Sequence, residues 1–260
     1  MTQPVLHQYD LGPGVRAFSS TRHGGVGRGN YASFNINFHC GDNPADIEAN
    51  RASLCRLLGI GPRHLVYPHQ VHGDVVAAID GRWLETLSPI ERSDSLDGVD
   101  AVMTDLGGVC IGVSTADCIP ILLYDAARHA CCAVHAGWRG TVKRIAQKAV
   151  EAMTARYGTD ARQLKAVIGP GISLEAFEVG EEVYRQFEDA HFDMARIARK
   201  YRKWHIDLWE CNRMQLVDMG IPQAAIQTAG ICTYTRHDDF FSARRLGIHS
   251  GRIFTGVLMD

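Results

Sequence analysis

The sequence predicts an α/β (α+β) fold in which a mixed β-sheet is flanked by helices and contains at least one antiparallel hairpin. Two observations carry this prediction. Apolar runs too short for helices recur along most of the chain, a pattern typical of buried strands. Longer segments with helix-capping signals lie between some of these runs. No repeat or Pro/Gly/Ser linker divides the 260 residues, which suffice for one large core, so we expect a single domain over residues 1–260.

The clearest helix is predicted over residues 43–59. Asn43 can cap its first turn, Pro44 suits the first helical position, and Gly59 ends it. Two further helices are predicted over residues 141–157 and 208–219, and a loop over residues 93–98. The predicted strands cover residues 15–20, 64–67, 74–79, 100–104, 109–113, 119–124, 130–135, 164–169 and 253–259.

Two of these strands, within "TADCIPILLYD" and "ACCAVH", are predicted to form the hairpin. A four-residue turn over residues 125–128 pairs Tyr124 with His129 and places Cys118 opposite His135. Directly opposed residues have Cβ atoms about 4.5–5.5 Å apart. A thiolate and an imidazole at that separation can bind one metal ion, at about 2.0–2.3 Å each. The register is decisive, because a slip of one residue would send the two side chains to opposite faces.

A catalytic zinc site commonly takes three protein ligands and leaves a fourth position open. The segment "YPHQVHGDVV" offers His69 and His72 as the third ligand, just before a predicted strand, and the spacing alone does not choose between them. One cysteine and two histidines suit zinc best, and copper is the second choice.

The composition limits the classes of partner that we expect for this protein. Hydrophobic residues at 46% and charged residues at 22% are ordinary globular values, so a packed soluble core is expected. A net charge of −2 gives no reason to expect nucleic acid or a membrane surface as partner. The start "MTQPVLHQYDLGPG" has neither the basic nor the apolar region of an export signal, so we expect a cytoplasmic protein with its eight cysteines reduced.

Several motifs resemble the YfiH-type family, described variously as purine nucleoside phosphorylases, laccase-like polyphenol oxidases and peptidoglycan editing factors. The resemblance covers nearly the whole chain and rests most specifically on "TADC" followed by "HAGWRG", with "QVHG" upstream. Further matching segments are "STRHGGVG", "NYASFNINFHCGDNPADIEANR", "GVDAVMTD", "VIGPGISLEAFEVGEEV" and "FFSARR".

The resemblance implies a metal bound by His72, Cys118 and His135, and so favours His72 over His69. It implies a zinc-dependent enzyme that cleaves purine nucleosides with phosphate to the free base and ribose 1-phosphate. Adenosine deamination and methylthioadenosine phosphorolysis are implied as accompanying activities. We expect purine nucleosides and phosphate as partners and a monomer or weak homodimer in solution.

Phosphate and substrate contacts are also predicted. The segment "HAGWRGT" leaves the metal-bearing strand and enters a helix that Thr141 is expected to cap, and Arg139 can bind an anion there. Arg22 and Asn35 lie in the N-terminal loop that resembles the family motif and are offered as substrate contacts. Asp117, beside the cysteine, is expected either to contact a histidine or to cap the strand end.

Three other readings remain open. Cys118 as nucleophile with His135 as its base would make a Cys-His hydrolase acting in peptidoglycan precursor editing, which does not require His72. A copper-dependent polyphenol oxidase is disfavoured, because a multicopper enzyme needs many clustered histidines. A binding protein with structural zinc would need a fourth ligand, for which His39 or His69 is the candidate.

Overall fold

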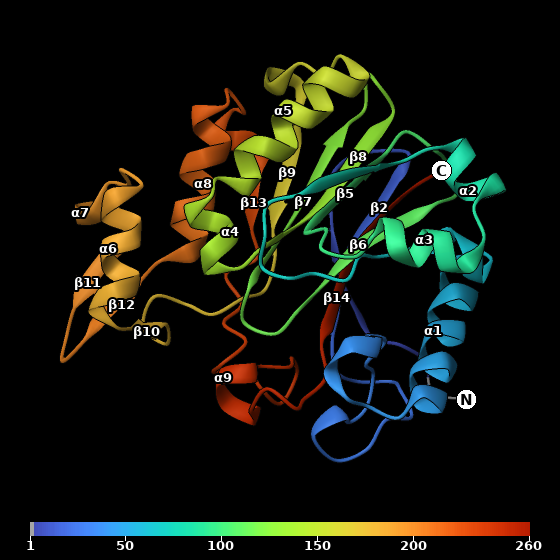
Figure 1. Cartoon of the computed structure of the whole chain (residues 1–260), viewed down its shortest axis with the longest axis horizontal. Helices are drawn as coiled ribbons and strands as arrows, with labels where there is room; N and C mark the ends of the chain where they lie inside the picture. The colour runs from blue at the N-terminus through green and yellow to red at the C-terminus, as the bar shows by residue number, and fades with distance from the viewer. Residues whose placement is uncertain (1–2) are drawn as a thin grey trace.

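The apolar runs form two large β-sheets that pack face to face in the computed structural model, which describes residues 3–260 (Figure 1). The first sheet has five strands in the order β1-β2-β14-β6-β3, and only its β3–β6 pair is parallel. Its strands are β1 (Leu6–Tyr9), β2 (Val15–Ser20), β3 (Leu65–Val66), β6 (Cys110–Thr115) and β14 (Ile253–Met259).

The second sheet has six strands in the order β13-β9-β7-β8-β5-β4, with parallel pairs at both edges and antiparallel pairs between them. Its strands are β4 (Val76–Ile79), β5 (Ala101–Thr104), β7 (Ile119–Asp125), β8 (Ala130–Ala136), β9 (Lys165–Ile168) and β13 (Ile226–Thr228). Both large sheets are mixed, which confirms the predicted fold class.

One buried cluster lies between the sheets. It joins Ile111 and Val257 of the first sheet to Leu122 and Val167 of the second, all fully buried. The predicted arrangement of one sheet flanked by helices is therefore incomplete. Strands with apolar residues on both faces are equally compatible with a helix or a second sheet as neighbour, so the runs alone could not separate the two arrangements.

Helices cover the outer face of each sheet. Helix α1 (Pro44–Leu58) packs Leu54 and Leu58 against Phe254 on the five-stranded sheet. Helices α5 (Ile145–Tyr157) and α8 (Leu208–Asp218) cover the six-stranded sheet, as Figure 1 shows. The result is a four-layer arrangement of helix, sheet, sheet and helix.

The long helices follow their capping signals. Asn43 accepts a hydrogen bond from the Ala45 N–H, and Gly59 ends α1 in the left-handed conformation, as predicted. The helix predicted over residues 141–157 is divided into α4 (Trp138–Val142) and α5 by Arg144, which adopts φ 64°. The Arg144 guanidinium donates to the Ala190 carbonyl, an anchor between distant segments that local sequence does not reveal.

The hairpin of β7 and β8 forms, but its register differs from the prediction by two residues. Asp125 pairs with Ala130, and His135 lies opposite Pro120 rather than Cys118. The Asp125 side chain accepts hydrogen bonds from the backbone of residues 127 and 128, and His129, at φ 49°, closes the turn. A shift of two residues preserves the side-chain alternation, so Cys118 and His135 stay on one side of the hairpin.

A small lobe beside the α8 layer has no counterpart in the predicted strands (Figure 1). Its short strands pair in the order β10-β12-β11, and the segment predicted as a loop over residues 93–98 begins inside helix α3. The remaining elements are β10 (Glu178–Val179), β11 (Ala198–Lys200), β12 (Trp204–Ile206), α2 (Gly81–Thr86), α3 (Pro89–Ser95), α6 (Glu181–Asp189), α7 (Met194–Ile197) and α9 (Ala243–Leu246).

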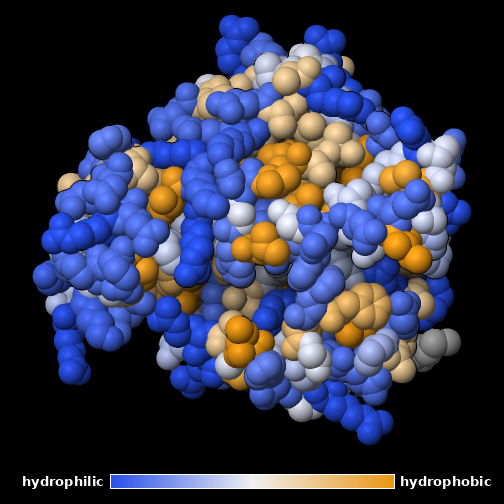
Figure 2. All heavy atoms as spheres, in the orientation of Figure 1, coloured by the Kyte–Doolittle hydropathy of each residue, from blue (hydrophilic) through white to orange (hydrophobic). Residues whose placement is uncertain are grey.

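The surface and the cysteines agree with the composition. Within residues 3–260, no helix has the length and apolar character needed to cross a membrane. On the face seen in Figure 2, hydrophobic residues are scattered in small groups among hydrophilic ones. All eight cysteines are free thiols, as expected for a chain with no need of disulfide bonds.

Candidate metal centre

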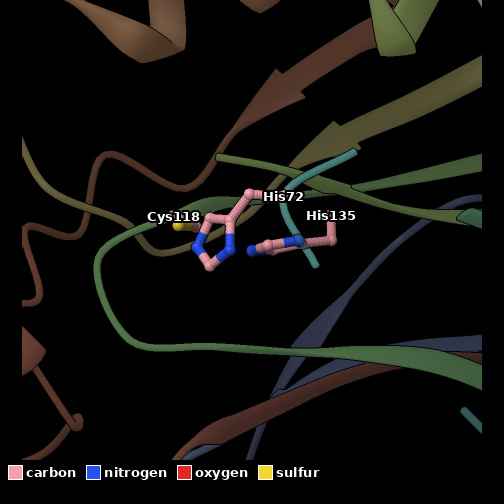
Figure 3. A group of neighbouring side chains, drawn as sticks. All are labelled: His72, Cys118 and His135. Carbon is pink, nitrogen blue, oxygen red and sulfur yellow. The ribbon is translucent and has the colours of Figure 1, made fainter. Parts of the chain in front are cut away.

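His72, Cys118 and His135 form one cluster, in which one potential ligand atom from each residue lies within 4.8 Å of the other two. Figure 3 shows the three side chains gathered from three different segments. His72 lies in the loop between β3 and β4, Cys118 immediately precedes β7, and His135 lies in β8. The two imidazoles meet edge to face, with ring centroids 4.9 Å apart. The fold thus brings together the three residues that the sequence analysis proposed as metal ligands.

Gly137 has no side chain, and atoms of the cluster occupy the space where its Cβ would lie. A Cβ atom at this position would lie 2.8 Å from His72 Cδ2, closer than real Cβ atoms approach, and 3.1 Å from Cys118 Sγ, tighter than most Cβ contacts. Gly140 has a comparable role, because a Cβ there would lie 2.8 Å from the carbonyl oxygen of Gly73, next to His72 in the chain. The glycines of "HAGWRG" therefore allow the start of α4 to pack directly against the cluster and its loop.

Asp100 organises two of the three side chains and was not singled out from the sequence. It is fully buried immediately before β5, and its Oδ1 accepts a hydrogen bond from Nδ1 of His135 at 2.7 Å. The same carboxylate accepts hydrogen bonds from the backbone N–H groups of Val71, His72 and Gly73. A carboxylate that holds Nδ1–H leaves Nε2 of His135 free to bind a metal, an arrangement common around protein metals. The signal in the sequence was an acid at the head of an apolar strand, where a buried charge needs partners.

The same carboxylate holds the backbone of His72 in an unusual conformation. His72 adopts φ 61°, in the left-handed region that non-glycine residues rarely occupy, while its N–H donates to Asp100 Oδ1 at 3.0 Å. Such conformations persist where surrounding contacts impose them and are frequent at functional sites. The turn directs the His72 ring toward Cys118 and His135.

In the metal-free protein, the pKa values of the cluster place a Cys118 thiolate beside a protonated His135, and a metal ion would displace the proton of that ring. Burial by itself raises the pKa of the Cys118 thiol, but the imidazoles of His135 and His72 outweigh burial and lower it to about 6. Burial likewise favours neutral His135, but the Cys118 thiolate and the Asp100 carboxylate raise the pKa of His135 to about 9. In the metal-free protein, Cys118 is therefore a thiolate near neutral pH, which is the form that binds metal.

The donor set fits a zinc ion, and it fits copper less specifically. One thiolate and two imidazoles are common zinc ligands, and three protein ligands leave a fourth position for water or substrate. Within residues 3–260 the cluster contains no fourth His, Cys, Asp or Glu. A cavity of about 270 Å³ adjoins all three side chains and gives the open side a connection to solvent. Its wall also includes Asn37, His39, His69, Gln70, Ala243 and Arg252.

Comparison with known proteins agrees with the family resemblance seen in the sequence. The family model described as "Multi-copper polyphenol oxidoreductase laccase" matches residues 16–260. The chain belongs to this laccase-like family. It is 46% identical to a protein of Bacteroides thetaiotaomicron named purine nucleoside phosphorylase, over 94% of this chain and 92% of the relative. It is 44% identical to the protein named adenosine deaminase RL5, from an unknown prokaryotic organism, over 94% of each chain.

Solved structures extend the agreement to the fold. The crystal structure of the Bacillus licheniformis hypothetical protein YfiH superimposes with a TM-score of 0.88, at 27% identity, covering 95% of this chain and 93% of that one. The YfiH-type resemblance and the mixed α/β fold class are thereby confirmed. The other residues predicted to contact substrate or phosphate are located by the structure, one at a time.

Arg139 lies on the exposed side of α4, with its guanidinium 4.3 Å from the centre of the Trp138 ring, outside the lining of the 270 Å³ cavity. Its role in binding phosphate stays a prediction. The capping role predicted for Thr141 was wrong, because α4 begins after Gly137 and Thr141 lies inside it. The helix begins earlier, with Gly137 rather than Thr141 at its N-cap.

Arg22 and Asn35 both fix backbone segments. The Arg22 guanidinium donates to the carbonyls of Ala32 and His237, at 2.7 Å each. The Asn35 side chain is fully buried, donates to Asp42 at 2.9 Å and accepts from the Arg252 N–H at 3.1 Å. Because Arg252 lines the cavity, Asn35 supports the cavity wall from behind. Direct contact of either residue with substrate stays a prediction.

Asp117 does not take the role around the histidines that Asp100 fills. Its carboxylate accepts hydrogen bonds from the Thr233 hydroxyl and from the Arg244 N–H, at 2.7 Å each. Asp117 therefore ties the entry of β7 to the C-terminal segment. His69, the other candidate for the third ligand, instead contacts Asp97 through Nδ1 at 2.6 Å.

Proposed function

We propose that this protein is a zinc-dependent purine nucleoside phosphorylase that converts adenosine, inosine or guanosine and phosphate to the free base and ribose 1-phosphate. The observation that carries the proposal is the three-donor cluster, open on one side to a cavity. The B. thetaiotaomicron relative with that name supports the choice of reaction, since it aligns with almost the whole chain.

The residues of the chain have distinct tasks in this proposal. His72, Cys118 and His135 would hold a zinc ion, which supplies positive charge to polarise an oxygen of a bound reactant. Asp100 keeps Nδ1 of His135 protonated, so that Nε2 faces the site. Arg252 contributes positive charge to the cavity wall, which favours an anion such as phosphate.

The shape of the cavity wall is also fixed by internal contacts. The Gln70 side-chain amide donates to the Ser114 carbonyl and accepts from the Ser114 N–H, at 2.8 Å in both cases. This double hydrogen bond anchors the chain two residues before His72 to strand β6. A pre-organised wall limits the entropy lost when a nucleoside binds.

Adenosine deamination is a second activity of the same site. The relative named adenosine deaminase RL5 supports it, at 44% identity. The metal that we propose for the cluster can also activate water, which deamination requires and phosphorolysis does not. The presence or absence of phosphate therefore separates the two reactions.

A Cys-His hydrolase acting on a peptidoglycan precursor is the alternative that a specific contact favours. Cys118, with its pKa lowered to about 6, would be the nucleophile and His135 its base. Asp100 would orient His135 through Nδ1. A copper-dependent polyphenol oxidase is supported only by the description of the family.

The test uses protein whose metal content has been measured. It is incubated with adenosine, inosine and guanosine, with and without phosphate, and the products are identified by chromatography. Phosphate-dependent release of base and ribose 1-phosphate is the expected result. Inosine formed from adenosine without phosphate would establish deamination. Absence of turnover with every nucleoside would overturn the proposal and favour the hydrolase.

A further inference from the structure

His69 and Asp97 form an oriented pair beside the candidate metal centre. Nδ1 of His69 lies 2.6 Å from Asp97 Oδ1, and an ionised carboxylate only accepts hydrogen bonds, so Nδ1 carries a proton. The backbone reinforces the pair: the His69 N–H donates to the Leu96 carbonyl and the Gly98 N–H donates to the His69 carbonyl, at 3.0 Å each. Nε2 is therefore the ring nitrogen left for a ligand.

A second contact fixes the plane of the His69 ring. The ring stacks on His39, with centroids 3.8 Å apart and planes inclined by 20°. His39 is in turn positioned by its N–H, which donates to the side chain of Asn37, another residue of the cavity wall. An imidazole held at one nitrogen, at its backbone and across one face is pre-organised in the way that a proton-transfer residue requires.

The His39–His69 pair lies where two cavities meet. Both rings line the 270 Å³ cavity of the metal centre, and both line a neighbouring cavity of about 750 Å³. Pockets for small ligands usually measure about 300–1,000 Å³, so a nucleoside with phosphate is expected to occupy part of the larger space as well. A reactant that extends from the metal centre into the larger cavity must pass His69.

We propose that His69 is the acid that protonates the leaving purine, an inference that rests on the proposed phosphorylase function. Protonated His69 donates its Nε2 proton to N7 of the purine as the C1′–N9 bond breaks, with the bonding electron pair moving onto the base. A phosphate oxygen forms the new bond to C1′. The products are ribose 1-phosphate and a neutral base with hydrogen on N7, and neutral His69 regains a proton from solvent. Asp97 is a positioning residue that orients the ring through Nδ1.

A substrate whose base is methylated on N7 tests this step directly. The base of 7-methylinosine already carries the positive charge that protonation of N7 would supply, so its departure needs no acid. His69→Gln should lower kcat for inosine by about 100-fold or more, the contribution typical of general acid catalysis. Its kcat for 7-methylinosine should stay close to that of the unmodified protein.

Two further variants complete the design. Asp97→Asn keeps the imidazole and should cause a smaller loss, again confined to inosine, which keeps the test informative if His69→Gln folds poorly. His23→Gln is the matched control, because His23 also pairs with an aspartate, Asp239, at 3.1 Å and is half exposed. His23 lies outside the lining of both cavities, so His23→Gln should leave kcat unchanged for both inosine and 7-methylinosine.

The outcomes separate the two proposals. Equal losses on inosine and 7-methylinosine, or no loss on either, would overturn the role of His69 while leaving the phosphorylase function standing. An unmodified protein that cleaves neither nucleoside with phosphate would overturn the proposed function, and the step with it. Metal content measured in every variant identifies a loss caused by a damaged metal centre.

Discussion

The Asp100 carboxylate accepts a hydrogen bond from Nδ1 of His135 at 2.7 Å while both side chains are buried, and it also accepts the N–H of His72. One buried acid thus sets the tautomer of one candidate ligand and the backbone of another. The hydrogen bond from His135 and the backbone donors of the His72 loop keep the pKa of Asp100 below its usual value, against the opposing effect of burial.

Asp100→Asn should weaken zinc binding by about 10–100-fold, the usual effect of removing an outer partner of a metal-binding histidine. An amide can present its NH₂ group to Nδ1 and disturb the tautomer that leaves Nε2 free. Zinc affinity measured by competition with a chromogenic chelator checks the prediction. Asp125→Asn is the control, because Asp125 is buried at the opposite end of the same hairpin and only supports its turn. Equal zinc affinity in the Asp100 variant and the unmodified protein would contradict the role of Asp100.

Gly137→Ala should reduce activity by about 100-fold, the scale associated with misplacing a catalytic group by an ångström. The added methyl group would lie 2.8 Å from His72 Cδ2, so the His72 ring must move. The backbone of Gly137, at φ −66°, accepts alanine without strain, which makes the effect purely steric. Gly81→Ala introduces the same methyl group into open space at the start of helix α2, and it should leave the activity unchanged. Full activity in the Gly137 variant would show that the cluster tolerates displacement.

His72→Ala should abolish both zinc retention and nucleoside phosphorolysis, because it removes one of three candidate ligands. The Cys-His hydrolase makes the opposite prediction, since Cys118, His135 and Asp100 all remain. Metal analysis after dialysis and the product assay on the same sample distinguish the two. His64→Ala, a half-buried histidine outside both cavities, serves as the control.

In the metal-free protein, alkylation of Cys118 by iodoacetamide should reach half of its full rate at about pH 6. Because the folded-state pKa of Cys118 is lowered to about 6, the reactive thiolate is present above that pH and is lost as the pH falls through it. An ordinary thiol would instead gain reactivity around pH 8.5, at about the unperturbed cysteine pKa. Mass spectrometry of the alkylated peptide against pH measures the midpoint. His135→Ala should move it upward by removing the largest opposing charge, and an unchanged midpoint would count against the pair.

In the hairpin of β7 and β8, local sequence predicted the strands but not their register. The apolar runs identified β7 and β8 correctly, but the register was wrong by two residues because Asp125 caps the turn instead of belonging to it. The candidate ligands survived this error only because strand side chains alternate with a period of two. A one-residue error would have separated Cys118 from His135.

Residue types and their local patterns determined most of the strands, the first long helix and the choice of Cys118 and His135 as candidate ligands, since burial, capping and donor chemistry are properties of short segments. The choice of His72 over His69 came from the family resemblance. Tertiary structure alone decided that two sheets stack, that Asp100 rather than Asp117 supports the histidines, and that His69 faces Asp97 instead of a metal. These outcomes depend on contacts between segments 28 or more residues apart, and such contacts form only when the whole chain packs.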